Sequence, residues 1–229
     1  MKKLLDHGYV KFIEPWGSDE RIIEAARMST DGGFVSWEPY EGHPKGDAGL
    51  LAHLYKNKHS TPFEMAGMVI EIKAPIFVFR EWHRHRTQSY NEMSARYIPL
   101  PNENYIPTRE RIIEGAKPST NRQAAGTVPL VREAIDDWLK ALNAFYIVAE
   151  ATYLTGLAMG IPKELARLPV PVARYSRMRA STNLRNWLAF LTLRQAPQAQ
   201  WEIRQYANAV GELVAEHFPR TWGLYATDR

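Results

Sequence analysis

The sequence predicts an α+β fold, a single domain with a small, mainly antiparallel sheet flanked by long helices. Two observations indicate this. Short stretches that alternate apolar and polar residues are scattered among longer segments with apolar residues at helical spacing. Neither an internal repeat nor a second domain boundary is evident, so residues 1–229 are predicted to fold as one unit. At 229 residues and 45% hydrophobic content, the chain is long enough to bury a core.

The first part of the chain is predicted to contain one strand and two helices. Residues 9–13 read as a short strand. Ser18 then caps a helix that the glycine pair at 32–33 closes. Asp47 is the expected cap of the next helix, whose leucines face inward.

The middle of the chain begins with a capping box from Thr61 to Glu64, in which the two end residues satisfy each other's backbone N–H groups. Residues 68–73 alternate as a strand does, and a helix over 75–82 follows. That helix leads directly into an Arg-His-Arg triplet. Polar stretches at 99–107 and 117–126 predict loops.

The last part of the chain is predicted to be mainly helical. Apolar residues spaced by three and four mark one long helix over 131–152, a spacing that indicates packing against other helices. Residues 170–179 alternate as another strand. Two helices, at about 183–193 and 198–218, complete the prediction.

Composition excludes several classes of function. The absence of cysteine removes disulfides, thiolate metal sites and cysteine nucleophiles. The 29 Lys and Arg against 25 Asp and Glu give a net charge of only +4, which does not single out nucleic acid as a partner. Neither a secretory leader nor a stretch long enough to span a membrane is present, so a cytoplasmic protein is expected.

The densest polar cluster runs from Arg84 to Arg96 and predicts an anion-binding site. Its arginines offer planar forks of donors that suit phosphate oxygens, and Ser94 with backbone N–H groups can complete a cradle. Asn91 and Glu92 add amide and carboxylate groups suited to a heterocycle or a ribose. The alternative is a solvated basic turn without a ligand.

A second cluster follows from helical geometry near the C-terminal end. At 100° per residue, Asn183, Trp187, Phe190 and Arg194 fall on one stripe, about 16 Å long. Trp187 and Phe190 are interpreted as core residues. Asn183 and Arg194, at the two ends of the stripe, are the candidates for ligand contact.

Two other functions use the same residues. His83 and His85, with His53 and His59, are possible ligands of a metal-dependent hydrolase, but no Asp accompanies them and the arginines beside His85 would repel a cation. A basic surface would suit an RNA-binding module, but aromatic residues do not interleave with it. This surface consists of Arg167, Arg174, Arg177 and Arg179. Neither metal nor nucleic acid is therefore the expected partner.

The stretch from Arg84 to Arg96 resembles the signature of flavin-dependent thymidylate synthases, in which Arg-His-Arg is followed seven residues later by Ser, here Ser94. The resemblance continues upstream through residues 59–64 and downstream through 183–194 and 199–202. It covers most of the chain, with the motifs in the family's order.

The resemblance implies a homotetramer that methylates dUMP to dTMP, with methylenetetrahydrofolate as one-carbon donor and NADPH-reduced FAD as hydride source. It implies that FAD is held by Thr61, Glu64, Arg84, His85, Arg86, Asn91, Glu92, Asn183 and Arg185. It implies that dUMP is bound by Glu81, Arg84, Glu92, Ser94, Ala95, Arg96, Arg167 and Arg194. Of these, Arg194 is the catalytic residue, and His59 is expected near the folate or NADPH.

Three positions depart from the commonest family pattern. Ala189 stands where a polar Asn or His is frequent, and Gln198 stands where a flavin-contacting His is frequent. Met65 follows Glu64 where His often does. The stretch from Arg84 to Arg96 and Arg194 keep the family pattern.

Overall fold

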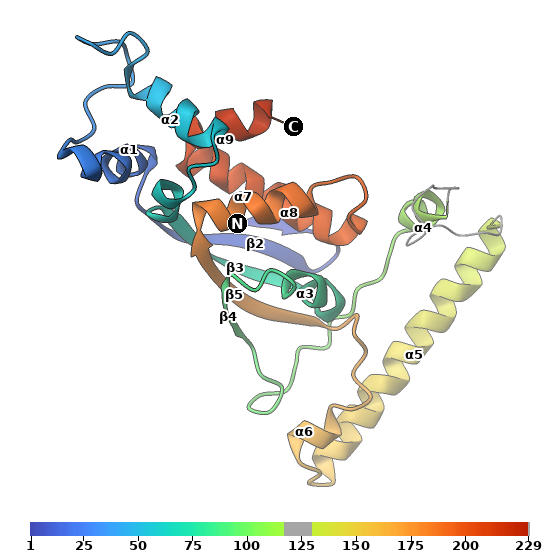
Figure 1. The fold of residues 1–229 in the computed structure, drawn as a ribbon. Coiled ribbons are helices and arrows are strands. Elements are labelled where there is room, and N and C mark those ends of the chain that lie inside the picture. Colours follow the sequence, from blue (N-terminus) through green and yellow to red (C-terminus); the bar gives the residue numbers. More distant parts are fainter. Residues whose placement is uncertain (117–129, 229) are drawn as a thin grey trace.

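The computed structural model describes residues 1–116 and 130–228, and its centre is a five-stranded sheet (Figure 1). Its strands are β1 (Lys2–Leu4), β2 (Gly8–Trp16), β3 (Gly67–Pro75), β4 (Ser89–Glu92) and β5 (Tyr175–Asn183). They are ordered β1-β2-β3-β5-β4, and each neighbouring pair is antiparallel. The predicted α+β class and antiparallel sheet are confirmed.

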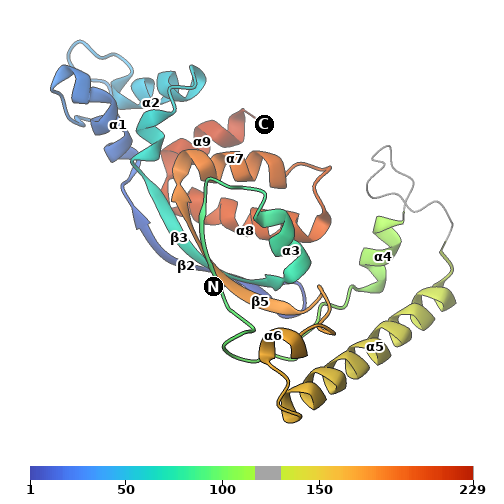
Figure 2. The ribbon, with the colours of Figure 1, turned by 60° about the horizontal axis from the view of Figure 1, so that its bottom comes forward.

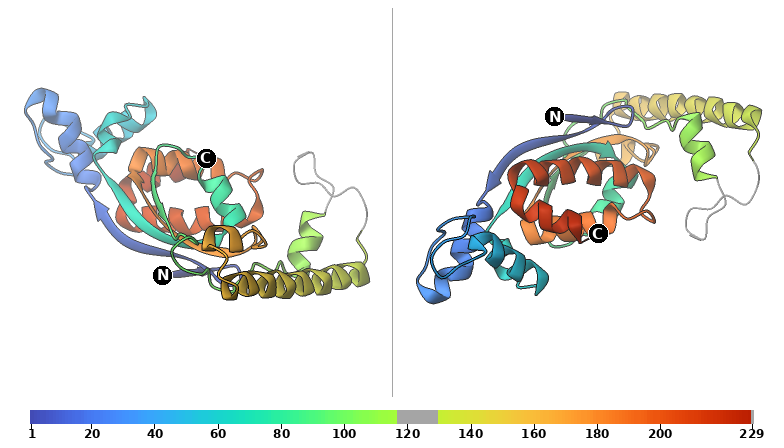
Figure 3. Two further views of the ribbon diagram at one scale, coloured as in Figure 1. Left: turned by 90° about the horizontal axis from the view of Figure 1, so that it is seen from below. Right: turned by 90° about the horizontal axis from the view of Figure 1, so that it is seen from above.

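Three helices cover one face of this sheet, as Figures 2 and 3 show. They are α3 (Ile76–Trp82), α7 (Leu184–Arg194) and α8 (Trp201–His217). Trp82, Trp187 and Phe190 are fully buried between sheet and helices, so both aromatic residues of the predicted stripe belong to the core. The helices therefore bring the end of α3 and the end of α7 to the same side of the sheet.

The opposite face of the sheet is polar. Along β3, buried residues alternate with half-buried ones such as Glu71, and along β5 Arg177 and Arg179 are exposed between buried neighbours. Arg179 pairs with Glu71 across the two strands at 3.6 Å. Arg177 and Arg179 of the predicted basic surface therefore lie on this face, whereas Arg174 is fully buried, contrary to the prediction.

At one end of the sheet lie α1 (Asp19–Arg27), the 3-10 turn η1 (Met28–Thr30), α2 (Gly46–Lys56) and α9 (Pro219–Thr227). The Ser18 cap is confirmed, because its hydroxyl accepts from the Arg21 N–H at 3.3 Å. The predicted glycine stop is wrong, because the left-handed residue after η1 is Asp31, with φ of 51°.

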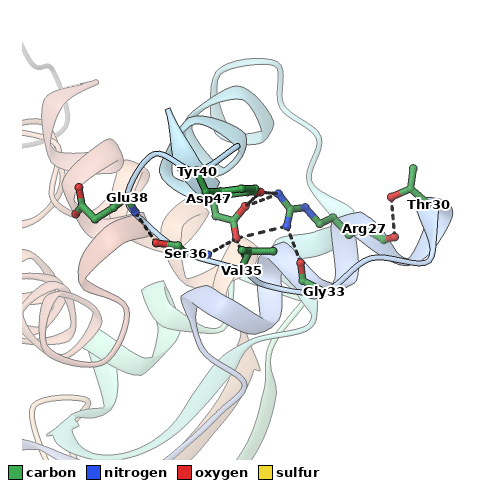
Figure 4. A network of polar contacts seen from close by, with 8 residues as sticks. All are labelled: Arg27, Thr30, Gly33, Val35, Ser36, Glu38, Tyr40 and Asp47. Atoms are coloured by element: carbon green, nitrogen blue, oxygen red, sulfur yellow. Dashed lines mark hydrogen bonds and ion pairs between the residues drawn. The ribbon is translucent and has the colours of Figure 1, made fainter. Parts of the chain in front are cut away.

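Asp47 does not cap α2, contrary to the prediction, because its carboxylate binds the preceding segment instead (Figure 4). It accepts from the N–H groups of Val35 and Ser36 at 2.8 and 3.2 Å and from the Tyr40 hydroxyl at 3.0 Å, and it pairs with Arg27. Burial alone would raise the pKa of Asp47, but these bonds and the Arg27 charge outweigh it and lower the pKa below its usual value.

The predicted capping box is also wrong. Thr61–Glu64 forms a single 3-10 turn, η2, rather than the start of an α-helix, and no side chain caps it. The Glu64 carboxylate instead pairs with Arg185 at the first turn of α7. A tertiary ion pair has therefore replaced the local capping interaction.

At the other end of the sheet stand α4 (Arg109–Gly115), α5 (Arg132–Ala158) and α6 (Lys163–Ala166). The predicted long helix is confirmed as α5, which runs past the sheet and packs against α4 and α6 (Figures 1 and 2). The predicted loop at 117–126 lies outside the described residues. Within 1–116 and 130–228, no helix is both long and apolar enough to cross a membrane.

Residues 170–174, predicted as strand, form a turn, so β5 starts at Tyr175. The N–H of Arg174 donates to the carbonyl of Pro171 at 3.0 Å. Because proline interrupts strands, the alternating apolar and polar residues before Tyr175 do not form part of β5. The helices predicted at 183–193 and 198–218 are confirmed as α7 and α8. The short elements β1, β4, α4, α6 and α9 were not predicted.

Candidate active site

The Arg-His-Arg triplet lies on a short loop between α3 and β4 whose conformation is fixed from inside the core. The Trp82 indole N–H donates to the Gln88 side-chain oxygen at 3.0 Å, and the Tyr90 hydroxyl donates to the His85 carbonyl at 2.7 Å. The Thr182 hydroxyl donates to the Thr87 carbonyl at 3.0 Å. The loop is therefore preorganised, with His85 partly buried.

Arg194, the last residue of α7, reaches this loop from a distant part of the sequence. Its Nε donates to Nε2 of His85 at 2.9 Å, and its Nη2 donates to the Glu81 carbonyl at 2.8 Å. Its Nη1 pairs with the Glu81 carboxylate, and only 10% of the Arg194 side chain is exposed. Three of the predicted site residues thus meet within one chain.

His85 is a neutral imidazole that accepts a hydrogen bond from Arg194. Because the guanidinium Nε can only donate, Nε2 of His85 accepts, and the ring proton lies on Nδ1. Burial first, and then the Arg194 charge, lower the pKa of His85, Glu81 opposes both, and the resulting pKa is about 4. The His85 ring also packs edge-on against Phe190, with ring centroids 4.9 Å apart. At neutral pH His85 is therefore an uncharged acceptor.

This lowered pKa predicts an acid-dependent loss of stability. The unfolded chain takes up a proton on His85 near its ordinary pKa of 6.5, whereas the folded chain does so only near 4. Folded-state stability therefore falls as pH drops through that window, by about 1 kcal/mol at about pH 5 after allowance for partial exposure. Urea denaturation at about pH 7 and pH 5 measures this change, and His85→Gln should lose that part of it. An equal pH dependence in the variant would contradict the assignment.

Arg84 and Arg86 flank His85 and point outward from the loop. Both are exposed, and among residues 1–116 and 130–228 neither side chain has a hydrogen-bond or ion-pair partner. Asn91 and Glu92, on the edge strand β4, are also exposed. These donors and acceptors are therefore available to a ligand at the sheet edge.

The segment after β4 is tied to α6. The Ser94 hydroxyl accepts from the Arg96 N–H at 3.3 Å, and the Arg96 guanidinium pairs with Glu164 at 3.0 Å. Ala95 is buried, so only its backbone is suited to polar contact with a ligand. Arg167 is exposed and caps the C-terminal end of α6, one turn after Glu164. Ser94, Arg96 and Arg167 are thereby brought to one region.

A third group of predicted residues lies where η2 meets α7. Arg185 pairs with Glu64, Thr61 is exposed, and the Asn183 side chain caps α7 by accepting from the Asn186 N–H at 3.0 Å. Beside them is a cavity of about 230 Å³. It is lined by Leu54, Tyr55, Lys58, His59, Ser60, Phe63, Arg185, Leu188, Ala189, Thr192 and Tyr225.

The histidines do not form a metal centre. Nε2 of His83 lies 3.2 Å from the Met178 sulfur, and His85 is bound to Arg194. The rings of His53 and His59 contact each other with centroids 5.7 Å apart. In the part of the chain that the structure describes, no three His, Asp or Glu side chains are grouped as metal ligands would be.

The sequence is similar to those of known proteins over nearly its whole length. The family model described as "Thymidylate synthase complementing protein" matches residues 11–220. A flavin-dependent thymidylate synthase of Thermus thermophilus is 39% identical over 222 residues, which cover 97% of this chain and 77% of the relative. The chain belongs to the flavin-dependent thymidylate synthase family. It is accordingly a methyltransferase, as the sequence predicted.

Other family members and solved structures agree. The flavin-dependent thymidylate synthase of Thermosipho africanus is 34% identical, and the match covers 97% of this chain and 92% of that one. A crystal structure of the UMP/dUMP methylase PolB from Streptomyces cacaoi, bound with 5-Br dUMP, superposes with a TM-score of 0.82 and 32% identity. It covers 98% of this chain and 97% of PolB, so the similarity extends through the whole thymidylate synthase fold.

Several residues that shape the site carry no signal in the sequence. Tyr90 and Gln88 hold the loop, and Phe190 packs against His85, but each looks like an ordinary strand, loop or core residue. Lys58 and Tyr55 line the cavity from the end of α2. Their contribution depends on contacts between segments that are far apart in the sequence.

Proposed function

We propose that the chain converts dUMP to dTMP, with methylenetetrahydrofolate as one-carbon donor and FAD, reduced by NADPH, as hydride source. The observation that carries this proposal is the fixed guanidinium of Arg194. A guanidinium has five N–H donors, and His85 and Glu81 take three of them, which leaves two for a ligand. The positively charged guanidinium of Arg194 therefore has a defined orientation and two N–H groups that can donate to a ligand.

The chain activates the uracil ring by charge, because it has no cysteine to attack the ring. Arg194 stabilises the negative charge that develops on uracil when its N3 proton is lost, and electron density then rises at the ring carbon that is methylated. The neutral imidazole of His85 keeps the guanidinium aimed without competing for the anion. Glu81 is assigned to the same substrate, and 42% of its side chain is exposed.

The phosphate of dUMP is assigned to the group formed by Ser94, Arg96 and Arg167, together with Arg84. Arginine and hydroxyl groups are the usual donors to phosphate oxygens. Arg96 is held only by a surface ion pair with Glu164, which a dianionic phosphate can displace. Glu92 and the Ala95 backbone complete the proposed nucleotide site.

FAD is assigned to a second set of donors, which shares Arg84 and Glu92 with the nucleotide site. Arg84, Arg86 and Arg185 supply guanidinium groups for a diphosphate, and the adjacent cavity has a largely apolar wall, to which Ala189 contributes a small side chain. Thr61, Glu64, His85, Asn91, Glu92 and Asn183 are the other residues assigned to it. When bound and reduced by NADPH, FAD supplies the hydride that turns the transferred methylene into methyl. His59, at the cavity rim, is assigned to the folate or NADPH.

An anaerobic assay tests this function. Purified protein with dUMP, methylenetetrahydrofolate, FAD and NADPH should form dTMP, and leaving out any one component should stop it. A parallel reaction with UMP tests whether the ribose 2′-hydroxyl is accepted, as the name of PolB suggests for that enzyme. A colourless protein that ignores FAD and shifts RNA in a gel would favour the nucleic-acid-binding alternative.

The proposal includes a homotetramer, and α5 supports an association of this kind. Phe145, Ile147, Val148 and Leu154 are each more than half exposed on this helix in the single chain. Exposed large apolar side chains gathered on one helix mark an interaction surface, since their exposure to water is unfavourable. A second copy of the chain is the occupant that the family resemblance implies.

Replacing two of these residues is expected to disrupt the assembly. Ile147→Lys combined with Val148→Glu should shift a tetramer to smaller species in light scattering coupled to gel filtration, because the charges would be buried without partners. Lys140→Glu, on an exposed part of the same helix, is the matched control and should leave the mass unchanged. An unchanged mass in the double variant would exclude this face from the interface.

A further inference from the structure

The cavity beside α7 combines an apolar floor with a cationic rim. Phe63, Leu188 and Tyr225 contribute to the floor, and Lys58 and Arg185 contribute to the rim. A space of about 230 Å³ is large enough for a planar ring system. The chemistry that matches this lining is a flat aromatic group with an anionic substituent that extends to the rim.

Lys58 occupies a backbone position that normally belongs to glycine. Its N–H donates to the Tyr55 carbonyl at 3.1 Å and the His59 N–H donates to the Leu54 carbonyl at 2.9 Å, which is the Schellman pattern at the end of α2. The residue itself is left-handed, with φ of 56°. Glycine adopts this conformation without the steric cost that a Cβ atom brings. The backbone at this position therefore favours glycine over lysine, which points to a role for the lysine side chain.

The ammonium group of Lys58 is only weakly held. It lies 5.0 Å from the centroid of the Tyr55 ring and 3.7 Å from the Asp228 carboxylate. The Lys58 side chain is 72% exposed and that of Asp228 is 60% exposed, so the pair is screened by water. Asp228 marks a position beside Lys58 where a carboxylate is accommodated.

Arg185, the other cation at the rim, is paired more firmly than Lys58. Its guanidinium pairs with Glu64 at hydrogen-bonding distance, and that carboxylate offsets its charge. A ligand can therefore bind the Lys58 ammonium by displacing only a weak, exposed ion pair. The family signature does not include this position, and neither Lys58 nor Asp228 belongs to the residues assigned above.

We propose that Lys58 binds the anionic part of a ligand whose ring system enters the cavity, and that this anion displaces Asp228. The inference rests on the proposed function, which supplies two sources of such an anion. One is the phosphate of a dinucleotide, either FAD or NADPH. The other is the glutamyl carboxylate tail of the folate.

The experiment compares equilibrium binding by wild type and variants of the full chain. The probes are FAD, NADPH, and 5-formyltetrahydrofolate with one or with five glutamates, each followed by fluorescence or calorimetry. Lys58→Gly should weaken one probe at least about five-fold, and Lys58→Arg should stay within about two-fold of wild type. Lys56→Ala removes a neighbouring exposed lysine of α2 that does not line the cavity, and it should change no affinity.

Thermal denaturation separates ligand binding from folding. Lys58→Gly should melt at the same temperature as wild type or higher, because glycine relieves the left-handed strain. Weaker binding without loss of stability is therefore the expected signature. Asp228→Asn should strengthen the same probe about two-fold, since it removes the competing carboxylate.

The probe that responds identifies the source of the anion. A larger effect on the pentaglutamate than on the monoglutamate assigns the folate tail, whereas an effect on FAD or NADPH assigns a phosphate. Unchanged affinities for all probes in Lys58→Gly, or no binding of any probe by wild type, would overturn the proposal. Lack of dTMP formation with intact, Lys58-dependent binding would instead count against the proposed function alone.

Discussion

Arg194→Ala is expected to lower the rate of dTMP formation by about 10²- to 10³-fold, the usual effect of removing a group that stabilises developing charge. The loss should fall on kcat, because the guanidinium is most needed once the uracil becomes negative. FAD affinity should stay within about three-fold of wild type, since the flavin donors assigned above lie on other residues. Single-turnover kinetics and flavin fluorescence measure the two quantities.

Arg194→Lys is the matched control for charge. A lysine keeps the positive charge but cannot donate in a fixed fork to both His85 and Glu81, so it should recover only a small part of the rate. Full activity in Arg194→Lys would show that the fixed orientation of the guanidinium is not needed for catalysis. Wild-type turnover in Arg194→Ala would remove Arg194 from the mechanism.

Arg174→Met is expected to destabilise the fold by about 3–5 kcal/mol, because it leaves a buried carboxylate without its partner. Arg174 is fully buried and donates to the Asn104 side-chain oxygen at 3.0 Å and to the Pro101 carbonyl at 2.9 Å. It also pairs with Glu150 on α5, whose side chain is only 13% exposed. One guanidinium thus ties α5 and the loop near 101–104 to the start of β5. Urea denaturation followed by circular dichroism measures the effect.

Two further sets of variants test whether the buried ion pair causes this loss of stability. Arg177→Met, three residues further along the chain in β5 but exposed, should change stability by less than about 0.5 kcal/mol. Arg174→Met combined with Glu150→Met should be less harmful than the sum of the single changes, because no unpaired charge remains. Strict additivity would mean that the ion pair is not what holds α5 in place.

The sequence predicted those elements of the fold whose signals are local and repeated. The long helix α5 and the strand β3 carry clear periodicity, and both were found close to their predicted bounds. Caps were predicted less well. Ser18 and Asp47 look alike in sequence, yet Asp47 turns away from its own helix because Arg27 and Tyr40 offer stronger partners. Such competition is settled by tertiary contacts.

The same distinction applies to the site. The stretch from Arg84 to Arg96 was recognisable as a cluster because its residues are contiguous. The contact of Arg194 with His85 spans 109 residues, and only the family resemblance linked the two segments. That His85 accepts rather than donates could not be predicted, because the lowered pKa arises from burial in the folded chain.

The polar contacts of Asp47 have a consequence for how the N-terminal segment opens. The N–H groups of Val35 and Ser36 both donate to the Asp47 carboxylate, whose pKa lies below its usual value. Its stabilising effect is present at neutral pH and disappears as acid protonates it. Amide hydrogens of Val35 and Ser36 should then exchange with solvent as one cooperative unit, while those of the central strands remain protected.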